Sequence, residues 1–174
     1  MKINLLSENL NWKKNLQEGF DTEKLIFRAF SGDELKPVLE ISSDNELFTY
    51  VDDINNCDDL EHWFKSVYQK KNYLFFTIKR AEYFENKEGL LGILMLNKIE
   101  FNVIELGGWI GKESRGKGYG RETVAGLVKY IKQKLPDTQL CAKTREDNSA
   151  GLRVLDTDGI ERKINRCHGD NDSD

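Results

Sequence analysis

The sequence predicts an α+β domain in which helices flank a mixed, mostly antiparallel sheet. The first observation is a succession of three apolar, strand-like segments at residues 73–79, 90–99 and 103–110, whose connections are typical of an antiparallel meander. The second is that amphipathic helical patterns precede and follow this meander. The third is that strands and helices do not alternate regularly, as they would in a purely parallel sheet.

The elements before the meander are predicted from apolar spacing and turn residues. Residues 9–18 are expected to form a short helix and residues 24–30 a strand, whereas residues 42–57 are rich in Asp and Asn and are expected to form a loop. A strong amphipathic helix follows, and Asp58 and Glu61 have the spacing of a capping box at its start. Its apolar residues repeat at helical spacing: Leu60, Trp63, Phe64, Val67 and Tyr68.

The elements after the meander are equally distinct. A helix is expected to end before Pro136, because proline cannot continue it. A strand at residues 138–143, a short helix at 148–156 and a last strand at 160–164 complete the predicted order. The apolar stripe of the helix before Pro136 is formed by Val124, Leu127, Val128 and Ile131.

Composition and charge narrow the functional classes. Apolar residues make up 39% of the chain and charged residues 32%, which is typical of a globular protein. The net charge of -4 argues against a nucleic-acid partner and favours cationic partners such as amines. There is no membrane-spanning segment and no secretory signal, so no membrane partner and a cytoplasmic location are expected.

The cysteines and histidines predict neither disulfides nor a metal site. Cys57, Cys141 and Cys167 are scattered and form no C-x-x-C pair, and His62 and His168 do not supply the spacing of a zinc site. No metal cofactor is therefore expected. All 174 residues are expected to belong to one domain, with its core at about 24–165 and a polar tail at 166–174 that is expected to be disordered.

The chemical signal is concentrated in a glycine-rich segment at residues 107–122, between a strand and a helix. Glycines allow tight bends that turn backbone N–H groups inward, and the N-terminus of the next helix adds unpaired donors. Together these groups can hold a pyrophosphate, and Arg115, Lys117 and Arg121 add positive charge. Such a segment can also be a simple tight corner, but the flanking strand and helix favour phosphate binding.

Three known phosphate motifs can be compared with this segment. The dinucleotide pattern G-x-G-x-x-G fails because the glycines here read G-x-G-x-G. A P-loop fails because Gly118 stands where a magnesium-binding hydroxyl is required. The pattern R/Q-x-x-G-x-G/A fits Arg115-x-x-Gly118-x-Gly120 without exception.

With this motif the chain resembles the GNAT acetyltransferases. Residues 24–30 are similar to the first strand of that family. Asn148, with Arg153-Val154-Leu155 and Asp158-Gly159-Ile160 after it, is similar to the family's N-x-x-S-x-x-V-L-E-K-x-G-F run. The resemblance covers residues 24 to about 165 and is closest to the branch that includes the ribosomal-protein N-terminal acetyltransferases.

The resemblance implies a GNAT-like sheet whose strand order is broken at a splayed acyl-CoA cleft. The pantetheine arm would bond to one strand edge, and the pyrophosphate would lie on the amides of the glycine-rich loop. Asn148 would bond the pantetheine, although it can also serve as a helix N-cap. The expected cofactor-binding residues are Trp109, Ile110, Gly111, Arg115, Gly116, Lys117, Gly118, Tyr119, Gly120, Arg121 and Asn148.

The implied chemistry needs a base, because an amine is protonated at neutral pH and attacks a thioester only when neutral. Glu105 is the candidate catalytic base, and strand alternation places it on the same face as Trp109. A solvent-facing surface role is the alternative for Glu105, and Glu100 is the second choice as base. The amide of Trp109 or Ile110 is the candidate donor to the oxyanion.

Two departures from the family pattern affect the acid and the acceptor. The positions of the usual tyrosine and serine acids are Leu155 and Gly151, which leaves water to protonate the thiolate. Asp44, Asp52 and Asp53 fall in the region that lines the acceptor site in the family, where they can hold a cation or form solvated surface.

The predicted function is transfer of an acetyl group from acetyl-CoA, as cosubstrate, to a primary amine of a protein N-terminus or a small molecule. The alternative is an acyl-CoA-binding or regulatory domain with weak catalysis, and a nucleotide-phosphate-binding domain is a third reading that Gly118 disfavours. Family members usually finish with a strand that completes the sheet. Residues 166–174 do not resemble such a strand, and an unpaired edge would favour a homodimer.

Overall fold

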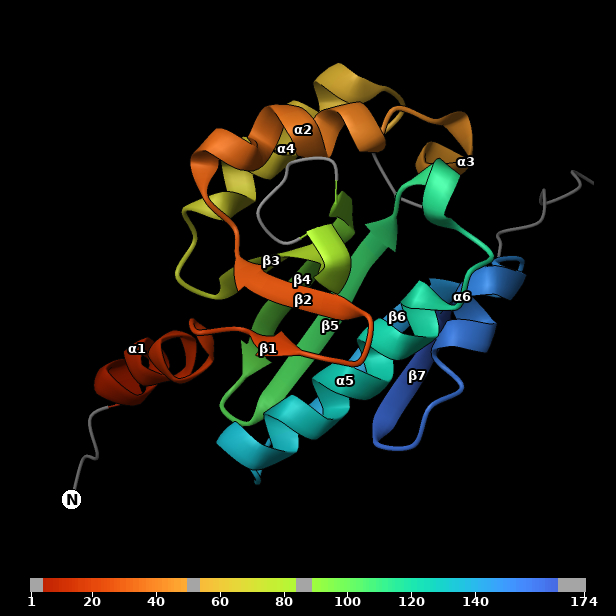
Figure 1. Cartoon of the computed structure of the whole chain (residues 1–174). Helices are drawn as coiled ribbons and strands as arrows, with labels where there is room; N and C mark the ends of the chain where they lie inside the picture. Colours follow the sequence, from red (N-terminus) through yellow and green to blue (C-terminus); the bar gives the residue numbers. More distant parts are fainter. Residues whose placement is uncertain (1–4, 50–53, 84–88, 166–174) are drawn as a thin grey trace, which may run out of the picture.

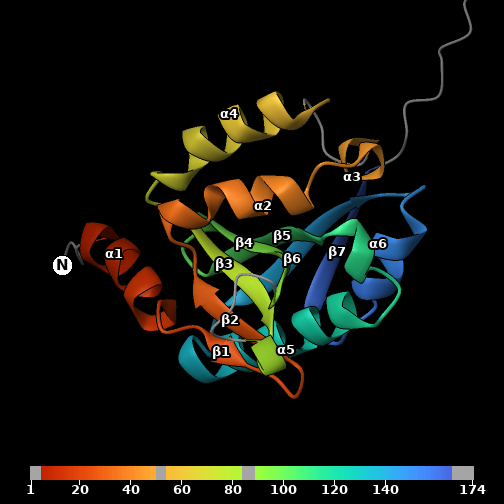
Figure 2. The same cartoon turned by 45° about the horizontal axis from the view of Figure 1, so that its top comes forward.

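The computed structural model describes residues 5–49, 54–83 and 89–165, which form a sheet with helices on both faces (Figures 1 and 2). Strands β1 to β5 pair antiparallel in chain order, and β5, β6 and β7 pair parallel. The predicted mixed, mostly antiparallel sheet is therefore confirmed. The strands are β1 (Phe20–Asp21), β2 (Leu25–Ala29), β3 (Tyr73–Arg80), β4 (Leu90–Glu100), β5 (Val103–Ile110), β6 (Gln139–Arg145) and β7 (Ile160–Asn165).

The helices lie in two layers. In Figure 2 the sheet separates α2 and α4 from α5, which covers the opposite face. None of the helices in the described ranges is long and apolar enough to cross a membrane. Their bounds are α1 (Leu5–Leu16), α2 (Leu35–Ile41), α3 (Asn45–Thr49), α4 (Cys57–Tyr68), α5 (Tyr119–Lys134) and α6 (Ser149–Val154).

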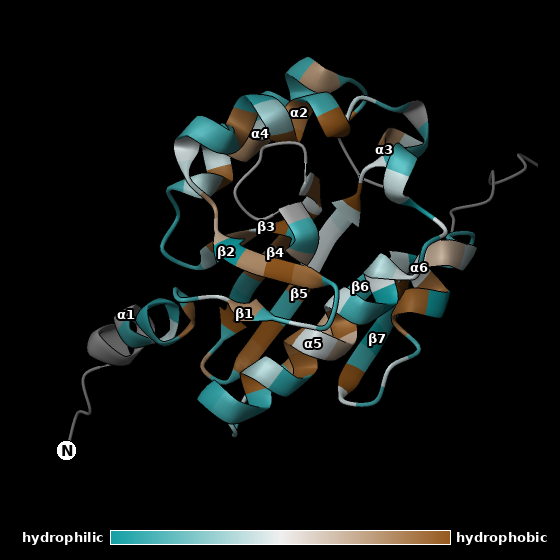
Figure 3. Ribbon diagram, viewed as in Figure 1, coloured by the Kyte–Doolittle hydropathy of each residue, from teal (hydrophilic) through white to brown (hydrophobic). Residues whose placement is uncertain are grey.

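Strand alternation divides the core between the two faces of the sheet. Phe76 and Leu127 belong to a cluster with α5, whereas Phe75 belongs to a second cluster with Phe64 and Val67 of α4. Neighbouring residues of β3 point to opposite faces, so one strand serves both clusters. Hydrophobic and hydrophilic positions alternate along α5, as its amphipathic pattern predicts (Figure 3).

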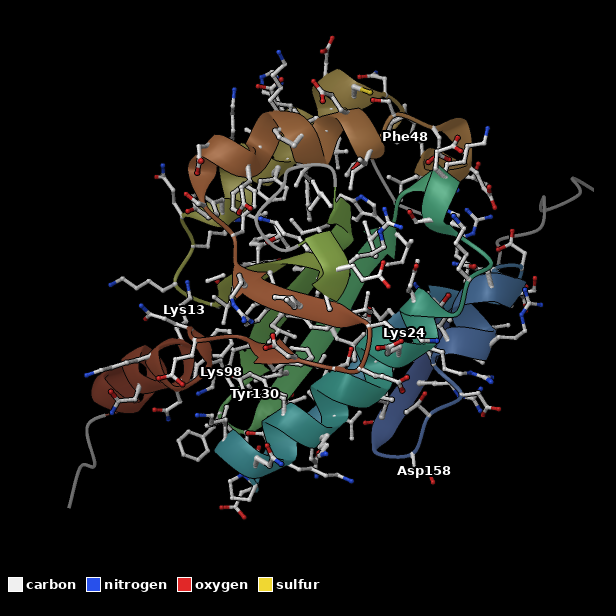
Figure 4. All side chains as sticks on the ribbon, in the orientation of Figure 1. Lys13, Lys24, Phe48, Lys98, Tyr130 and Asp158 are labelled. Atoms are coloured by element: carbon white, nitrogen blue, oxygen red, sulfur yellow. The ribbon has the colours of Figure 1, made fainter. Side chains whose placement is uncertain are left out.

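The N-terminal segment is fixed to α5 by an aromatic residue. The Tyr130 hydroxyl donates a hydrogen bond to the Leu16 carbonyl over 3.0 Å, and its ring stacks on Phe20 with 4.8 Å between ring centroids (Figure 4). Burial raises the pKa of Tyr130. This contact packs α1 and β1 against the end of α5. It explains why β1, a two-residue strand that the sequence did not predict, joins the edge of the sheet.

Two local predictions in the first half were wrong. The segment expected to be a loop contains α3, because Asp44 Oδ1 accepts a hydrogen bond from the Leu47 N–H over 3.0 Å and Leu47 is buried. The cap of α4 is Asn56, whose side chain accepts from the Asp59 N–H over 2.9 Å, rather than Asp58. Both errors arise from Asp- and Asn-rich segments, in which several side chains compete to cap one helix.

The C-terminal edge of the described sheet is exposed. Strand β7 pairs with β6 through residues such as Ile160 and Asn165, and five of its six positions are exposed. The exposed fraction of Ile164 is 52%. The predicted tail at 166–174 lies outside the described residues.

Candidate functional site

The first feature of the site is an opening between β5 and β6. The ladder between these parallel strands ends at the pair Leu106 and Ala142, although β5 runs on to Ile110 and β6 to Arg145. Beyond Leu106, the edge of β5 that faces β6 has no strand partner within residues 5–49, 54–83 and 89–165. Its backbone groups are therefore available to an extended ligand that adds to the edge as a strand would. The predicted splay lies at this point.

The second feature is the loop that follows β5. In Figure 1 the chain leaves β5, passes beside α3 and enters α5 next to α6. Gly116 and Gly118 have φ angles of +74° and +84°, in the left-handed region that favours glycine. The space where their Cβ atoms would lie is open within 4 Å. The loop thus has the backbone bends and the clearance that close contact with a ligand requires.

The loop presents a run of backbone donors. The N–H groups of Gly116, Lys117 and Gly118 donate no hydrogen bond to any residue that the structure describes, and Gly118 caps α5. The first turn of α5 adds the amides of Tyr119, Gly120 and Arg121, which have no intrahelical acceptor. Together with the dipole of α5, these donors make the N-terminus of α5 suited to bind an anion.

Two of the predicted cations are free to turn toward this end. Lys117 Nζ donates to the Glu113 carbonyl over 2.8 Å, and Arg121 donates to the Arg153 carbonyl over 3.3 Å. Both side chains are exposed. Because carbonyls are neutral acceptors, a phosphate can replace these contacts with charge-assisted hydrogen bonds, which are stronger.

Arg115 is engaged differently. Its guanidinium pairs with Asp44 at 2.8 Å and 3.1 Å and with Glu46 at 3.0 Å, and its Nε donates to the Ile110 carbonyl over 2.9 Å. Arg115 therefore ties the end of β5 to α3, and two carboxylates balance its charge. Asp44 is committed to this pair, whereas Asp52 and Asp53 lie outside the described residues.

The Arg115 contact has a measurable effect on stability. Burial raises the pKa of Asp44, but hydrogen bonds from Arg115 and from the Leu47 amide outweigh burial and hold the pKa below its usual value. A lowered carboxyl pKa stabilises the fold above the unfolded value of about 3.9, and this contribution is lost as the pH falls through the folded pKa. The contact thus contributes to stability at neutral pH and not in acid.

Asp44→Asn is expected to lower the free energy of unfolding by about 1 kcal/mol at pH 7, because Arg115 loses a charged partner with a side chain only 9% exposed. Urea unfolding should show a loss that is constant from pH 8 to 5 and shrinks below about pH 4. Asp156→Asn is the control, since Asp156 is 71% exposed in its pair with Arg162. A loss unchanged down to pH 3 would exclude the ion pair as its source.

Trp109, Ile110 and Gly111 form the end of the β5 edge. The Trp109 indole N–H donates to the hydroxyl of Ser42, the C-cap of α2, over 2.6 Å, which fixes the side chain on the α2 face. The Gly111 N–H donates to the Leu91 carbonyl over 2.7 Å, so this amide is occupied. A Cβ at Gly111 would lie 3.0 Å from the Ile41 carbonyl oxygen, which explains the glycine by close packing.

Glu105 lies on β5 at the start of the opening, with a side chain only 15% exposed. Its Oε2 is 3.0 Å from the Lys143 ammonium of β6, an ion pair whose geometry falls short of a well-aligned hydrogen bond. This contact raises the pKa of Lys143. Lys143 is 55% exposed, so an alkylammonium group already reaches Glu105 from the solvent side. Glu100, the second choice, is the last residue of β4 and pairs with Val103 at the start of β5, at the end of that strand away from the loop.

The structure also places the residues after β6. Asn148 caps α6, and its side-chain oxygen accepts from the Gly151 N–H over 2.8 Å. Leu155 is buried in the core. Sequence reasoning missed Thr144, a buried β6 residue whose hydroxyl has no hydrogen-bond partner, because only its packing against α6 distinguishes it. In the described part of the chain, no cluster of His, Cys, Asp and Glu is arranged to hold a metal ion.

The splayed sheet and the glycine-rich loop define an acyltransferase class, and the family comparison agrees. The chain belongs to the acetyltransferase (GNAT) domain family, whose profile matches residues 24–161. No curated protein sequence matches the chain.

Solved structures share the fold at low sequence identity. A GNAT-family acetyltransferase from Bacillus anthracis has a TM-score of 0.65 and 20% identity, covering 79% of this chain and 80% of its own. An acetyltransferase from Salmonella typhimurium that modifies the N-terminal serine of a 50S ribosomal subunit protein has a TM-score of 0.61 and 17% identity. This match covers 77% of this chain and 78% of the Salmonella chain. Spermidine N-acetyltransferase from Vibrio cholerae, in complex with CoA and spermine, has a TM-score of 0.60 and 17% identity. This match covers 76% of this chain and 78% of the Vibrio chain.

Proposed function

We propose that this chain transfers the acetyl group of acetyl-CoA to a primary amine. The observation that carries the proposal is the continuity of the opening beyond Leu106 with the donor-rich loop before α5. The pantetheine arm would add to the free edge of β5 beyond Leu106, at the Ile110 N–H. The pyrophosphate would then lie on the amides from Gly116 to Arg121, with Lys117 beside it.

In the proposed reaction, Glu105 takes a proton from the acceptor ammonium, directly or through water. The neutral nitrogen attacks the thioester carbonyl and becomes cationic, and it then loses its second proton to water. The C–S bond breaks with its electron pair passing to sulfur, and the thiolate takes a proton from water after release. The Ile110 amide, on the edge of β5 that faces away from β4, stabilises the oxyanion formed between these events. The Trp109 amide does not serve, because the register that joins the Gly111 N–H to the Leu91 carbonyl directs the Trp109 N–H to β4. The acceptor ammonium would displace the Lys143 ammonium from Glu105. One ammonium–carboxylate ion pair would thus replace another.

The proposed acceptor class is a primary amine, with the N-terminal amine of a protein as the first candidate and a polyamine as the second. Structural relatives are described as acting on each of these. Both acceptors offer an ammonium group that can pair with Glu105, and the net charge of -4 favours the approach of cations.

The deciding experiment is calorimetric titration with acetyl-CoA, with magnesium-ATP as the control. Acetyl-CoA is expected to bind in the micromolar range and magnesium-ATP not to bind. Release of free thiol is then followed with a peptide that has an N-terminal serine and with spermidine. Absence of acetyl-CoA binding would refute the proposal. Binding without thiol release from any amine would instead favour a CoA-binding regulatory domain, which the residues Gly151 and Leu155 at the usual acid positions also suggest.

A further inference from the structure

Strand β7 is the long exposed edge of the described sheet. It ends the strand order (Figure 1), and five of its six positions are exposed. The opposite edge is β1, which has only two residues. An exposed edge presents N–H and C=O groups that can pair with a further strand. A second copy of this chain offers one edge strand of matching length, which is its own β7, and a two-fold axis would then relate the copies.

The ladder with β6 determines which backbone groups of β7 face outward. The Asn165 carbonyl accepts a hydrogen bond from the Glu146 N–H over 3.0 Å, so the backbone groups of Asn165 face β6. The register with β6 has no shift along the whole of β7, so the backbone direction alternates from residue to residue. The N–H and C=O groups of Ile160, Arg162 and Ile164 therefore face away from β6.

These directions limit how two copies of β7 can pair antiparallel. Residues that exchange both backbone hydrogen bonds must face each other, so outward-facing residues must lie opposite outward-facing residues. A symmetric pair then has one central residue that lies opposite its own copy. Centres at Glu161 or Lys163 put like charges together in a non-hydrogen-bonded pair, where side chains are closest, and form no opposite-charge pair. A centre at Arg162 opposes like charges only in the wider hydrogen-bonded pair, and Asp156 lies 3.6 Å from each guanidinium.

The register centred on Arg162 joins opposite charges and apolar side chains. Glu161 of each copy lies opposite Lys163 of the other, and neither residue forms an ion pair with the described residues of its own chain. Ile164, which is 52% exposed, lies opposite Ile160 of the second copy. Ile160 is partly buried against the core cluster with α5, so the pairing would extend that apolar surface over Ile164. Cross-strand pairs of both kinds stabilise a sheet.

We propose that two copies of this chain pair through antiparallel β7 strands, with the two-fold axis at Arg162. Because the axis is perpendicular to the sheet, the two sheets join into one and α5 covers the same face in both copies. The surface consists of one strand and its side chains, so the dissociation constant is expected to be in about the micromolar range. The outer edge of β7 is separated by β6 from the opening beside β5, so each copy keeps its own candidate site.

Exchange of the two opposed charges tests this pairing. Sedimentation velocity of the full chain from about 1 to 200 μM should show a monomer–dimer equilibrium. Glu161→Lys and Lys163→Glu each put like charges opposite one another on both sides of the centre, and each should weaken dimerisation by about tenfold or more. An equal mixture of the two variants has opposite charges in every such pair and should form a heterodimer. The double variant has them within one chain, at the net charge of the wild type, and should dimerise like the wild type.

Lys129→Glu is the charge control, because Lys129 of α5 is exposed and lines a cleft with Phe20 of β1, at the other edge of the sheet. It should dimerise like the wild type. All variants are expected to fold, since both β7 side chains are exposed, and thermal melting checks this.

The outcomes are distinct from those that bear on acetyl transfer. Loss of the dimer in the two single variants, with recovery in the mixture and in the double variant, supports the proposal. A wild type that stays monomeric up to about 200 μM overturns it, and so do single variants that dimerise as tightly as the wild type. Loss without recovery in the mixture excludes the register centred on Arg162. Acetyl-CoA binding and thiol release are measured separately, and their absence would leave the β7 pairing standing.

Discussion

Glu105→Gln is expected to lower kcat for acetyl transfer by about 10²- to 10⁴-fold and to leave the affinity for acetyl-CoA unchanged. Glutamine has nearly the same shape as glutamate but cannot accept the proton of the acceptor ammonium. The loop amides that would hold the pyrophosphate begin at Gly116, beyond the end of β5, so cofactor binding does not depend on this carboxylate. Thiol release with the best acceptor from the amine panel, and calorimetry with acetyl-CoA, measure the two effects separately.

Glu161→Gln is the matched control for this substitution. Glu161 lies opposite Cys141, which in turn lies opposite Glu105, so both glutamates stand at the same level of the sheet. Unlike Glu105, Glu161 is exposed on the edge strand. The control should keep wild-type turnover. Equal rates for Glu105→Gln and the wild type would remove Glu105 from the reaction, and equal losses in both variants would indicate a general effect of charge.

Gly118→Glu is expected to weaken acetyl-CoA binding by about 100-fold, because it places a negative charge at the N-terminus of α5 where the pyrophosphate would lie. Apart from Gly118 itself and its chain neighbours, no atom of the described residues lies within 4 Å of the Cβ position of Gly118, so the side chain fits without a clash. The φ angle of +84° adds backbone strain of about 1–2 kcal/mol for any L-residue. Calorimetric titration with acetyl-CoA gives the affinity.

Gly118→Gln separates charge from strain, since glutamine has the same size and requires the same backbone conformation. We expect it to weaken binding by about tenfold or less, leaving at least another tenfold to the charge of glutamate. Thermal melting should show equal stability for the two variants. If both bind acetyl-CoA as tightly as the wild type, the loop before α5 is not the pyrophosphate site.

The sheet and the long helices could be predicted because their signals are local and repeated. A continuous run of buried residues around Phe75, alternation around Ile104 and helical spacing from Val124 to Ile131 each extend over several residues. The element β1 has only two residues, too few for any period, and it depends on the stacking of Phe20 on Tyr130. The helix α3 has five residues, and its cap is hidden among other Asp and Asn residues.

The candidate site divides in the same way. The loop around Gly118 was predictable because its bends, amides and following helix are contiguous in the chain. The partner of Arg115 was not, since Asp44 lies 71 residues away and only the folded chain brings α3 to the loop. Thr144 was equally hidden, because an unpaired hydroxyl is a property of packing and leaves no pattern in the sequence.

Arg115 connects the α3 segment to the entrance of the loop before α5. One guanidinium holds Asp44 and Glu46 of the α3 segment as well as the Ile110 carbonyl at the entrance of the loop. A ligand that draws this guanidinium toward the loop must release α3, and whatever fixes α3 holds the guanidinium away from the loop. Linkage is reciprocal, so any such effect of one ligand on the affinity for the other is matched by the same factor in reverse. Cofactor and acceptor that meet across this residue would therefore not bind independently.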